Sequence, residues 1–201
     1  AAGTLTLDYA ANQSGTADIT VRATDTGGLF VETTFTVTVN AVNDAPLARP
    51  DGVHLSFDGD DFIRVDDDPS LQMTNNVTIE AWINPDTLTD KHRIVTKVGE
   101  KYVLRAHWGD NLEAYIDKGG TLYHVRKDDI IAAGYQHVVF TWDGVSGDNL
   151  LRLYYNGAEV VSYTVREGEG GPGTAVTAPI DTSDSPLKIG SHDSGEYWDG
   201  I

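Results

Sequence analysis

The sequence predicts an all-β protein in which a partial sandwich is followed by a larger antiparallel jelly-roll sandwich. Segments that alternate apolar and polar residues recur through all 201 residues, and Gly, Asn and Asp turns separate them. Helical periodicity is nearly absent. Pro46 and Pro50 interrupt the pattern within a short stretch, where no paired central strand can continue. We therefore expect one unit at residues 1–46, a linker at residues 47–52 and a second unit at residues 53–201.

The first unit is expected to contain three strands. Residues 5–9, 17–23 and 35–39 alternate as half-buried strands do, and turn residues fill positions 12–15 and 25–28. Three short strands bury too little surface to fold alone. We expect their partners to come from upstream sequence or from a neighbouring domain.

The second unit is expected to form about eleven strands with hairpin turns between several of them. Large aromatic residues at alternating positions, such as Trp82, Phe140 and Tyr155, are predicted to lie in its core. One helical turn is possible at residues 128–133. Hairpin signals lie at residues 118–120, 143–144 and 156–157, and the expected strands are 54–57, 62–65, 77–83, 93–97, 102–108, 111–117, 121–126, 137–142, 151–156, 159–165 and 187–189.

The charge balance restricts the possible partners. The chain has 14 basic and 31 acidic residues, and its first 50 residues hold only two of the basic and five of the acidic ones. The resulting net charge of −17 argues against nucleic acid or an anionic membrane as a partner and suits a secreted protein that meets cations. No cysteine is present, and no apolar run approaches the ~18 residues of a membrane span, so we expect no disulfide and no membrane insertion.

The end of the first unit resembles a cadherin-like repeat of large bacterial surface proteins. The resemblance rests on residues 19–28, the Thr/Val strand that follows, and Val42-Asn43-Asp44-Ala45-Pro46. It implies that Asp25, Asn43 and Asp44 are calcium ligands, with Asp25 at the opposite end of the domain from the other two. A turn capped by Asn43 and Asp44 is the alternative. Ala41 stands where cadherin linkers carry an acidic residue, which implies weaker calcium binding.

The second unit resembles the laminin-G-like, concanavalin A-like jelly roll. Five segments match it in order and spacing, namely residues 55–65, 77–85, 136–144, 153–157 and 187–190. The family closes with a strand just after the position of residues 198–201, so we expect the chain to be a piece of a longer protein. The resemblance implies glycan binding, calcium-dependent adhesion or glucan hydrolysis, because one fold hosts several functions.

An acidic loop is the first candidate metal site. Asp58 and Asp60 flank Gly59, which lets backbone carbonyls turn inward as calcium coordination requires. Related jelly rolls hold a structural calcium near this loop, which favours a Ca²⁺ site that Asp199 completes from the far end of the unit. A solvated acidic turn is the alternative.

Strand parity places the candidate ligand-binding residues on one sheet face. Tyr102, Leu104, Ala106 and Trp108 share the apolar face of one strand, which leaves the polar residues opposite. Rings and planar donors on one surface suit sugars, and an ordinary polar outer face is the alternative. His192 and Trp198 lie in a predicted rim loop. The candidate ligand-binding residues are Arg105, His107, Tyr115, His124, Arg126, His192 and Trp198.

We expect no catalysis by this chain. Glucanases of this fold carry Glu-x-Asp-x-x-Glu on one strand, whereas the nearest strand here offers only Glu113 and Asp117 on one face. We expect a calcium-supported module of a secreted or cell-surface bacterial adhesin, which binds a glycan or another surface ligand and adjoins further repeats of the same polypeptide. The alternatives are a structural spacer without a ligand, an accessory domain of a polysaccharide-degrading enzyme, and hydrolysis that depends on Glu113.

Overall fold

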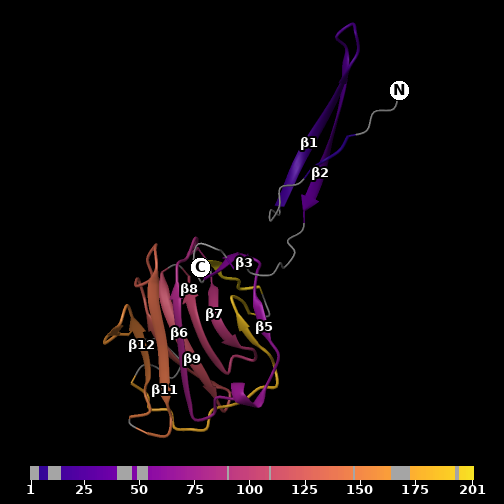
Figure 1. The fold of residues 1–201 in the computed structure, drawn as a ribbon. Coiled ribbons are helices and arrows are strands. Elements are labelled where there is room, and N and C mark those ends of the chain that lie inside the picture. Colours follow the sequence, from indigo (N-terminus) through magenta and orange to yellow (C-terminus); the bar gives the residue numbers. More distant parts are fainter. Residues whose placement is uncertain are drawn as a thin grey trace. The chain divides into compact units, whose positions relative to one another are not determined.

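The computed structural model confirms the all-β prediction (Figure 1). The chain divides into two compact units, Ala1–Asn43 and Asp44–Ile201. No helix in the described ranges is long and apolar enough to cross a bilayer. The structure describes residues 5–8, 15–39, 54–89, 91–108, 110–146, 148–163, 173–192 and 195–201, together with the backbone of residues 47–48.

The first unit contains an antiparallel hairpin of β1 (Gly15–Thr24) and β2 (Phe30–Val39). Cross-strand pairs of threonines support it, and Thr20 Oγ1 lies 2.8 Å from Thr34 Oγ1. The strand predicted at residues 5–9 is wrong in its described part, because residues 5–8 form no strand and Tyr9 lies outside the described residues. Phe35 and most other side chains of the hairpin remain exposed, as expected of two strands that no other described segment covers.

The second unit is a sandwich of antiparallel sheets. A six-stranded sheet has the order β10-β9-β8-β7-β14-β5, a four-stranded sheet has the order β13-β12-β11-β6, and β15-β4-β3 form a small third sheet. The strands are β3 (Leu47–Ala48), β4 (Leu55–Asp58), β5 (Ile63–Val65), β6 (Asn76–Ile83), β7 (His92–Lys97), β8 (Tyr102–His107), β9 (Asn111–Lys118), β10 (Thr121–Lys127), β11 (Gln136–Asp143), β12 (Leu151–Tyr155), β13 (Ala158–Glu159), β14 (Leu187–Ile189) and β15 (Asp199–Gly200).

The core lies between the two large sheets because alternate side chains of both point inward. Leu104 and Ala114 contribute from the six-stranded sheet, and Phe140 and Leu153 contribute from the four-stranded one. All four are fully buried. Trp142 joins the core, and its indole Nε1 donates a hydrogen bond to the carbonyl of Val176 at 2.8 Å.

Several local predictions differ from the structure. Residues 47–48, expected in the linker, form β3 and pair with β4. Asp143 does not form a tight hairpin, because its Oδ1 accepts the backbone N–H groups of Val145 and Ser146 in a longer loop. The strand expected at residues 159–165 is reduced to β13 in its described part. Residues 128–133 form no helix, and the described helical element is a 3₁₀ turn, η1 (Pro69–Leu71).

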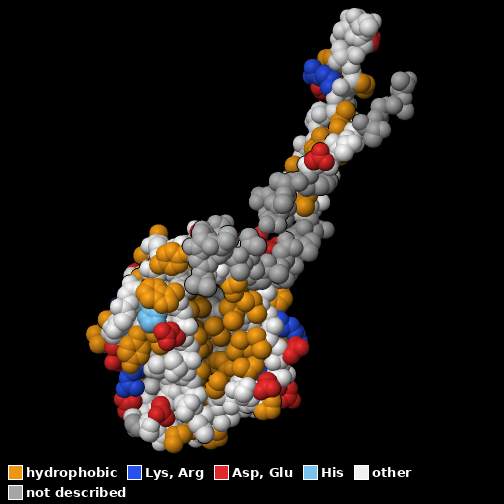
Figure 2. Space-filling model, in the orientation of Figure 1, with side chains coloured by type: hydrophobic (Ala, Val, Ile, Leu, Met, Phe, Trp, Pro, Cys, Tyr) orange, Lys and Arg blue, Asp and Glu red, His pale blue; other side chains and the backbone are white. Residues whose placement is uncertain are grey.

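The strand β6 borders an open side of the sandwich. Ile201 exchanges two backbone hydrogen bonds with Asn84, of 2.6 and 2.8 Å, just beyond the end of β6. Along its own length β6 pairs with β11 alone among the described strands. Figure 2 shows a hydrophobic area beside it, and half-buried apolar residues such as Ile63, Leu187 and Ile189 belong to the strands on that side.

Candidate functional site

The outer face of the six-stranded sheet carries a row of charged residues. The register aligns Arg93 on β7, Arg105 on β8, Glu113 on β9 and Arg126 on β10 across four neighbouring strands. These residues occupy the face opposite the apolar side chains, as the parity of each strand requires. The predicted set Arg105, His107, Tyr115, His124 and Arg126 is therefore brought together on one surface.

Glu113 is the centre of this surface. Its side chain is fully buried, and Oε2 accepts a hydrogen bond from Arg105 Nε at 2.7 Å. His124 Nδ1 lies 3.1 Å from Oε1, and His107 Nδ1 lies 3.9 Å from Oε2. Arg126 Nη1 lies 3.2 Å from the same nitrogen of His107, which links the arginine to the network. Burial alone would raise the pKa of Glu113, but the His124 hydrogen bond and the charges of Arg105 and His107 outweigh it and lower that pKa strongly.

Arg93 forms a second centre beside the first. Its Nη1 donates to the hydroxyl of Tyr115 at 2.5 Å, its Nη2 lies 3.1 Å from Glu100 Oε1, and its Nε pairs with Glu196. Burial would lower the pKa of Arg93, but its contacts with Tyr115 and Glu196 raise that pKa. His192 Nε2 lies 3.6 Å from Glu100 Oε1, so the predicted rim histidine reaches the same network.

The predicted ligand-binding residues thus lie on one face, but the central ones are buried by each other's side chains. Arg105, His107, Tyr115 and His124 are all buried and contact one another or Glu113, so the expectation of an open polar surface is wrong there. The long side chains cover each other, a result that strand parity alone does not reveal. The accessible groups lie at the margin, where Arg126 and His192 retain partial exposure.

Trp198 and Trp108 both differ from their predicted environments. Trp198 is not on the rim, because it is 3% exposed and meets His92 edge-to-face with ring centroids 6.1 Å apart. Trp108 is not in the core, because it is 55% exposed. It follows the end of β8 with φ of +42°, and Asn111 Nδ2 donates to its carbonyl at 2.8 Å.

Trp108 sits on the polar margin among groups that sequence analysis did not select. Its ring centroid is 4.3 Å from that of His107, and Lys91 Nζ lies 4.9 Å from the Trp108 centroid. Lys91 also lies 3.4 Å from Glu196, so the exposed ring adjoins the Arg93 network. The turn residues after Trp108 in the sequence are the signal that could have placed it at a strand end.

The acidic loop after β4 gathers three carboxylates. Asp58, Asp60 and Asp61 each offer an oxygen within 4.8 Å of the others, and Asp61 is buried. Asp61 is an addition to the residues predicted from sequence. Oxygen ligands at this separation suit Ca²⁺.

Asp199 lies beside this loop. It pairs with Asp58 across β15 and β4, and a Cβ built on Gly59 would lie 3.8 Å from the Asp199 side chain. Gly59 has φ of +93°, which other residues rarely adopt, so the turn that gathers the carboxylates requires glycine. The metal-binding role of Asp58, Asp60 and Asp199 stays a prediction.

Of the metal ligands predicted near the first unit, only Asp25 lies within the described residues. Asp25 lies in the β1–β2 turn, where its Oδ1 accepts the backbone N–H groups of Gly27 at 2.8 Å and Leu29 at 2.9 Å. This is the geometry of a capped turn. Asn43 and Asp44 lie outside the described residues.

Comparison with known proteins agrees with the two-sheet architecture. A family model described as the Concanavalin A-like lectin/glucanases superfamily matches residues 57–201. No curated protein matches the chain. The family match covers well over half of the sequence and includes both large sheets. The chain therefore belongs to the concanavalin A-like lectin/glucanases superfamily.

Proposed function

We propose that the second unit is a non-catalytic carbohydrate-binding module that calcium supports. Membership in a superfamily of lectins and glucanases fits such a module. The observation that carries the proposal is Trp108, whose largely exposed ring stands beside a rigid network of charged groups. Sugars bind through C–H faces that stack on aromatic rings and through hydroxyls that take charged hydrogen bonds.

The proposed sugar site lies at the margin of the six-stranded sheet. Trp108 offers the stacking surface, and Lys91, Glu196 and Arg126 offer donors and acceptors around it. Arg105 and Glu113 do not contact the sugar in this proposal. They hold His107, which packs against Trp108, and so keep the ring in place.

The proposed calcium site is the Asp58, Asp60 and Asp61 cluster, with Asp199 as a further oxygen donor. The donor set fits a hard divalent cation, because all of these ligands are carboxylates that lie close together. Bound calcium would tie the loop after β4 to β15. The ion is therefore proposed to stabilise the fold rather than to contact the sugar.

Catalysis is not part of the proposal. Hydrolysis of a glycosidic bond needs two carboxyl groups that can reach the substrate. Glu113 is fully buried, its carboxylate pairs with Arg105, and two histidines approach it. A carboxylate held ionised in this way is a poor proton donor.

The wider setting is also proposed. The acidic, cysteine-free composition supports a secreted or surface-exposed module of a large bacterial adhesin, with neighbouring repeats of the same polypeptide as further partners. A cadherin-like identity of the first unit belongs to this part of the proposal. A structural spacer would have the same calcium response without any ligand.

The experiment is a glycan array probed in the presence of calcium. We expect retention on at least one class of glycan, and at least a tenfold weaker signal for Trp108→Ala. Tyr135→Ala is the matched control, because Tyr135 is an exposed aromatic residue of similar accessibility, at 56%. An array that stays silent for the folded, calcium-loaded chain would favour the spacer.

A further inference from the structure

A second exposed tryptophan stands on the opposite sheet of the sandwich. Trp82 was predicted to lie in the core, and this is wrong, because it is 65% exposed on the outer face of β6. Its neighbours Ala81 and Ile83 take the inward positions. A large aromatic ring is therefore presented to solvent from a strand whose alternate side chains are anchored in the core.

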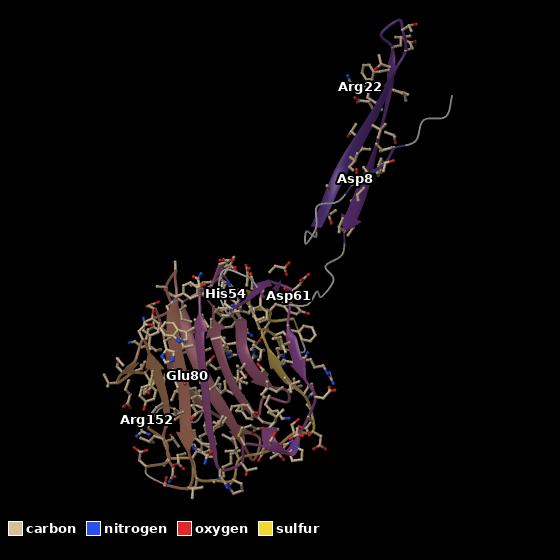
Figure 3. The ribbon with its side chains drawn as sticks, viewed as in Figure 1. Asp8, Arg22, His54, Asp61, Glu80 and Arg152 are labelled. Atoms are coloured by element: carbon tan, nitrogen blue, oxygen red, sulfur yellow. The ribbon has the colours of Figure 1, made fainter. Side chains whose placement is uncertain are left out.

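The surroundings of Trp82 are ordered and polar. His137, its cross-strand partner on β11, packs against it with ring centroids 5.0 Å apart and a tilt of 35°. His137 Nε2 lies 2.8 Å from Glu80 Oε1, so the carboxylate of Glu80 fixes the imidazole. Figure 2 shows hydrophobic side chains around a histidine and an acidic residue on this face, and Figure 3 labels Glu80 there.

Several polar atoms around the ring have no partner in the described part of the chain. The indole Nε1 of Trp82 and the Nδ1 of His137 make no hydrogen bond with a described residue. Glu80 is exposed, and only its Oε1 contacts His137. One stacking surface is thus bordered by a donor, an imidazole nitrogen and a carboxylate oxygen.

We propose that Trp82, His137 and Glu80 form a second binding platform that takes a pyranose ring of a neutral glycan. The C–H face of the sugar stacks on the indole, and its hydroxyls bond Glu80, the indole N–H and His137 Nδ1. The inference rests on the proposed function for the class of ligand. It concerns a separate location, on the outer face of the other sheet.

The polar atoms favour a sugar over an apolar protein surface. A partner that covers Trp82 with apolar side chains would bury the Glu80 carboxylate and His137 Nδ1 without compensation, which is costly. Hydroxyl groups both donate and accept, so one sugar ring satisfies all three groups. The net charge of −17 and the adjacent Glu80 disfavour an acidic glycan.

Two platforms on opposite sheets would let one domain hold two glycan chains. Simultaneous engagement raises overall avidity without any stronger individual contact. Loss of either tryptophan would then reduce binding to a dense glycan surface more than binding to a free monosaccharide.

The test follows the four tryptophan indole N–H signals by nuclear magnetic resonance during titration with methyl glucoside, methyl galactoside and methyl mannoside. The signal that disappears in Trp82→Phe is assigned to Trp82. We expect at least one glycoside to shift this signal saturably. The Trp142 signal is an internal reference that should stay fixed, because that indole is buried and bonded to Val176.

Matched variants separate the platform from its surroundings. Trp82→Ala should abolish the saturable response, read from backbone signals of β6 and β11. Glu80→Gln and His137→Gln should each weaken it several-fold, as lost polar contacts do. Thr78→Ala, on the same outer face of β6, should leave it unchanged.

The outcomes distinguish this inference from the proposed function. A Trp82 signal that is static against all three glycosides overturns the inference, and a Trp108 response in the same titration leaves the proposed function standing. If the Trp82 signal shifts and the Trp108 signal does not, the platform at Trp82 is supported and the sugar site proposed at Trp108 is contradicted. A Trp82 signal that shifts only with protein concentration would overturn the inference in favour of self-association.

Discussion

Arg105 donates from Nε to Oε2 of Glu113 at 2.7 Å, and both side chains lie buried on the outer face of the six-stranded sheet. The pair aligns across β8 and β9, so the two strands bring the charges together without any loop. His107 and His124 approach the same carboxylate. The geometry makes Glu113 the single anion on which three cationic or hydrogen-bonding side chains converge.

Replacement of Glu113 should therefore destabilise the domain strongly. Glu113→Gln removes the charge and leaves Arg105 buried without its counter-ion, for which we expect a loss of about 3–5 kcal/mol in the free energy of unfolding. Urea denaturation measures this loss. Glu80→Gln is the control, because the exposed pair of Glu80 with His137 should contribute less than about 1 kcal/mol. Equal effects of the two substitutions would show that the network does not hold the sheet.

The same network predicts an acid-sensitive fold. The pKa of Glu113 is lowered in the folded state, so its contribution is complete above the carboxyl pKa of the unfolded chain, about 4.3, and is lost as pH falls through the folded-state pKa. Burial alone would raise the pKa of Glu196, but its contacts with Arg93 outweigh burial and lower that pKa. Unfolding free energies measured between neutral and acid pH should fall less steeply for Glu113→Gln than for the unmodified chain. Parallel curves would contradict this assignment.

Strand parity predicted the polar face but not its burial. Alternation along β8 and β9 is enough to place Arg105 and Tyr115 on one side. Whether such side chains project into solvent or fold over each other depends on cross-strand register, which pairs Arg105 with Glu113 and is absent from any single strand. The parity of β8 and β9 therefore predicts that Arg105, Glu113 and Tyr115 share a face, and only the structure reveals their contacts and the part that Arg93 and Glu196 take.

The tryptophans show where reasoning from residue size fails. The alternation of Ala81 and Ile83 already points Trp82 outward, but its aromatic bulk favoured a core position. Trp108 follows the last residue of β8, where φ becomes positive and the alternation no longer applies. Trp198 is buried against His92, which lies more than a hundred residues away in sequence and which local pattern does not bring near it.

Calcium should stabilise the second unit through the acidic loop. At one hundred times the dissociation constant, an ion that binds only the folded state adds about 2.7 kcal/mol. Thermal melting with calcium and with chelator measures this gain, and Asp61→Asn should remove most of it. Asp66→Asn is the control, because Asp66 is exposed and pairs with Arg64. An equal melting temperature with calcium and with chelator would contradict the calcium assignment.

The backbone of Gly200 in β15 packs closely against the backbone of the segment that follows β6. A Cβ at this position would lie 2.3 Å from the carbonyl oxygen of Asn84, and φ is +128°. We expect Gly200→Ala to cost about 2–4 kcal/mol, because neither backbone segment can move freely. Gly120→Ala serves as the control, since its Cβ would meet nothing within 4 Å and only its positive φ opposes the change. A loss for Gly200→Ala no larger than the control's would show that β15 is not held at this contact.

Hydrogen exchange should distinguish the two edges of β6. The N–H and C=O groups of Asn84 both bond Ile201 and therefore point away from β11. Because backbone groups alternate in direction along a strand, the N–H groups of residues 82, 80 and 78 point to the same side. The carbonyl of His137 accepts the N–H of Asn156 and thus faces β12, which agrees with this assignment for its partner Trp82. We therefore expect the amides of Thr78, Glu80 and Trp82 to exchange faster than those of Ile79 and Ala81, which face β11. Uniform protection along β6 would mean that another segment pairs with its outer edge in solution.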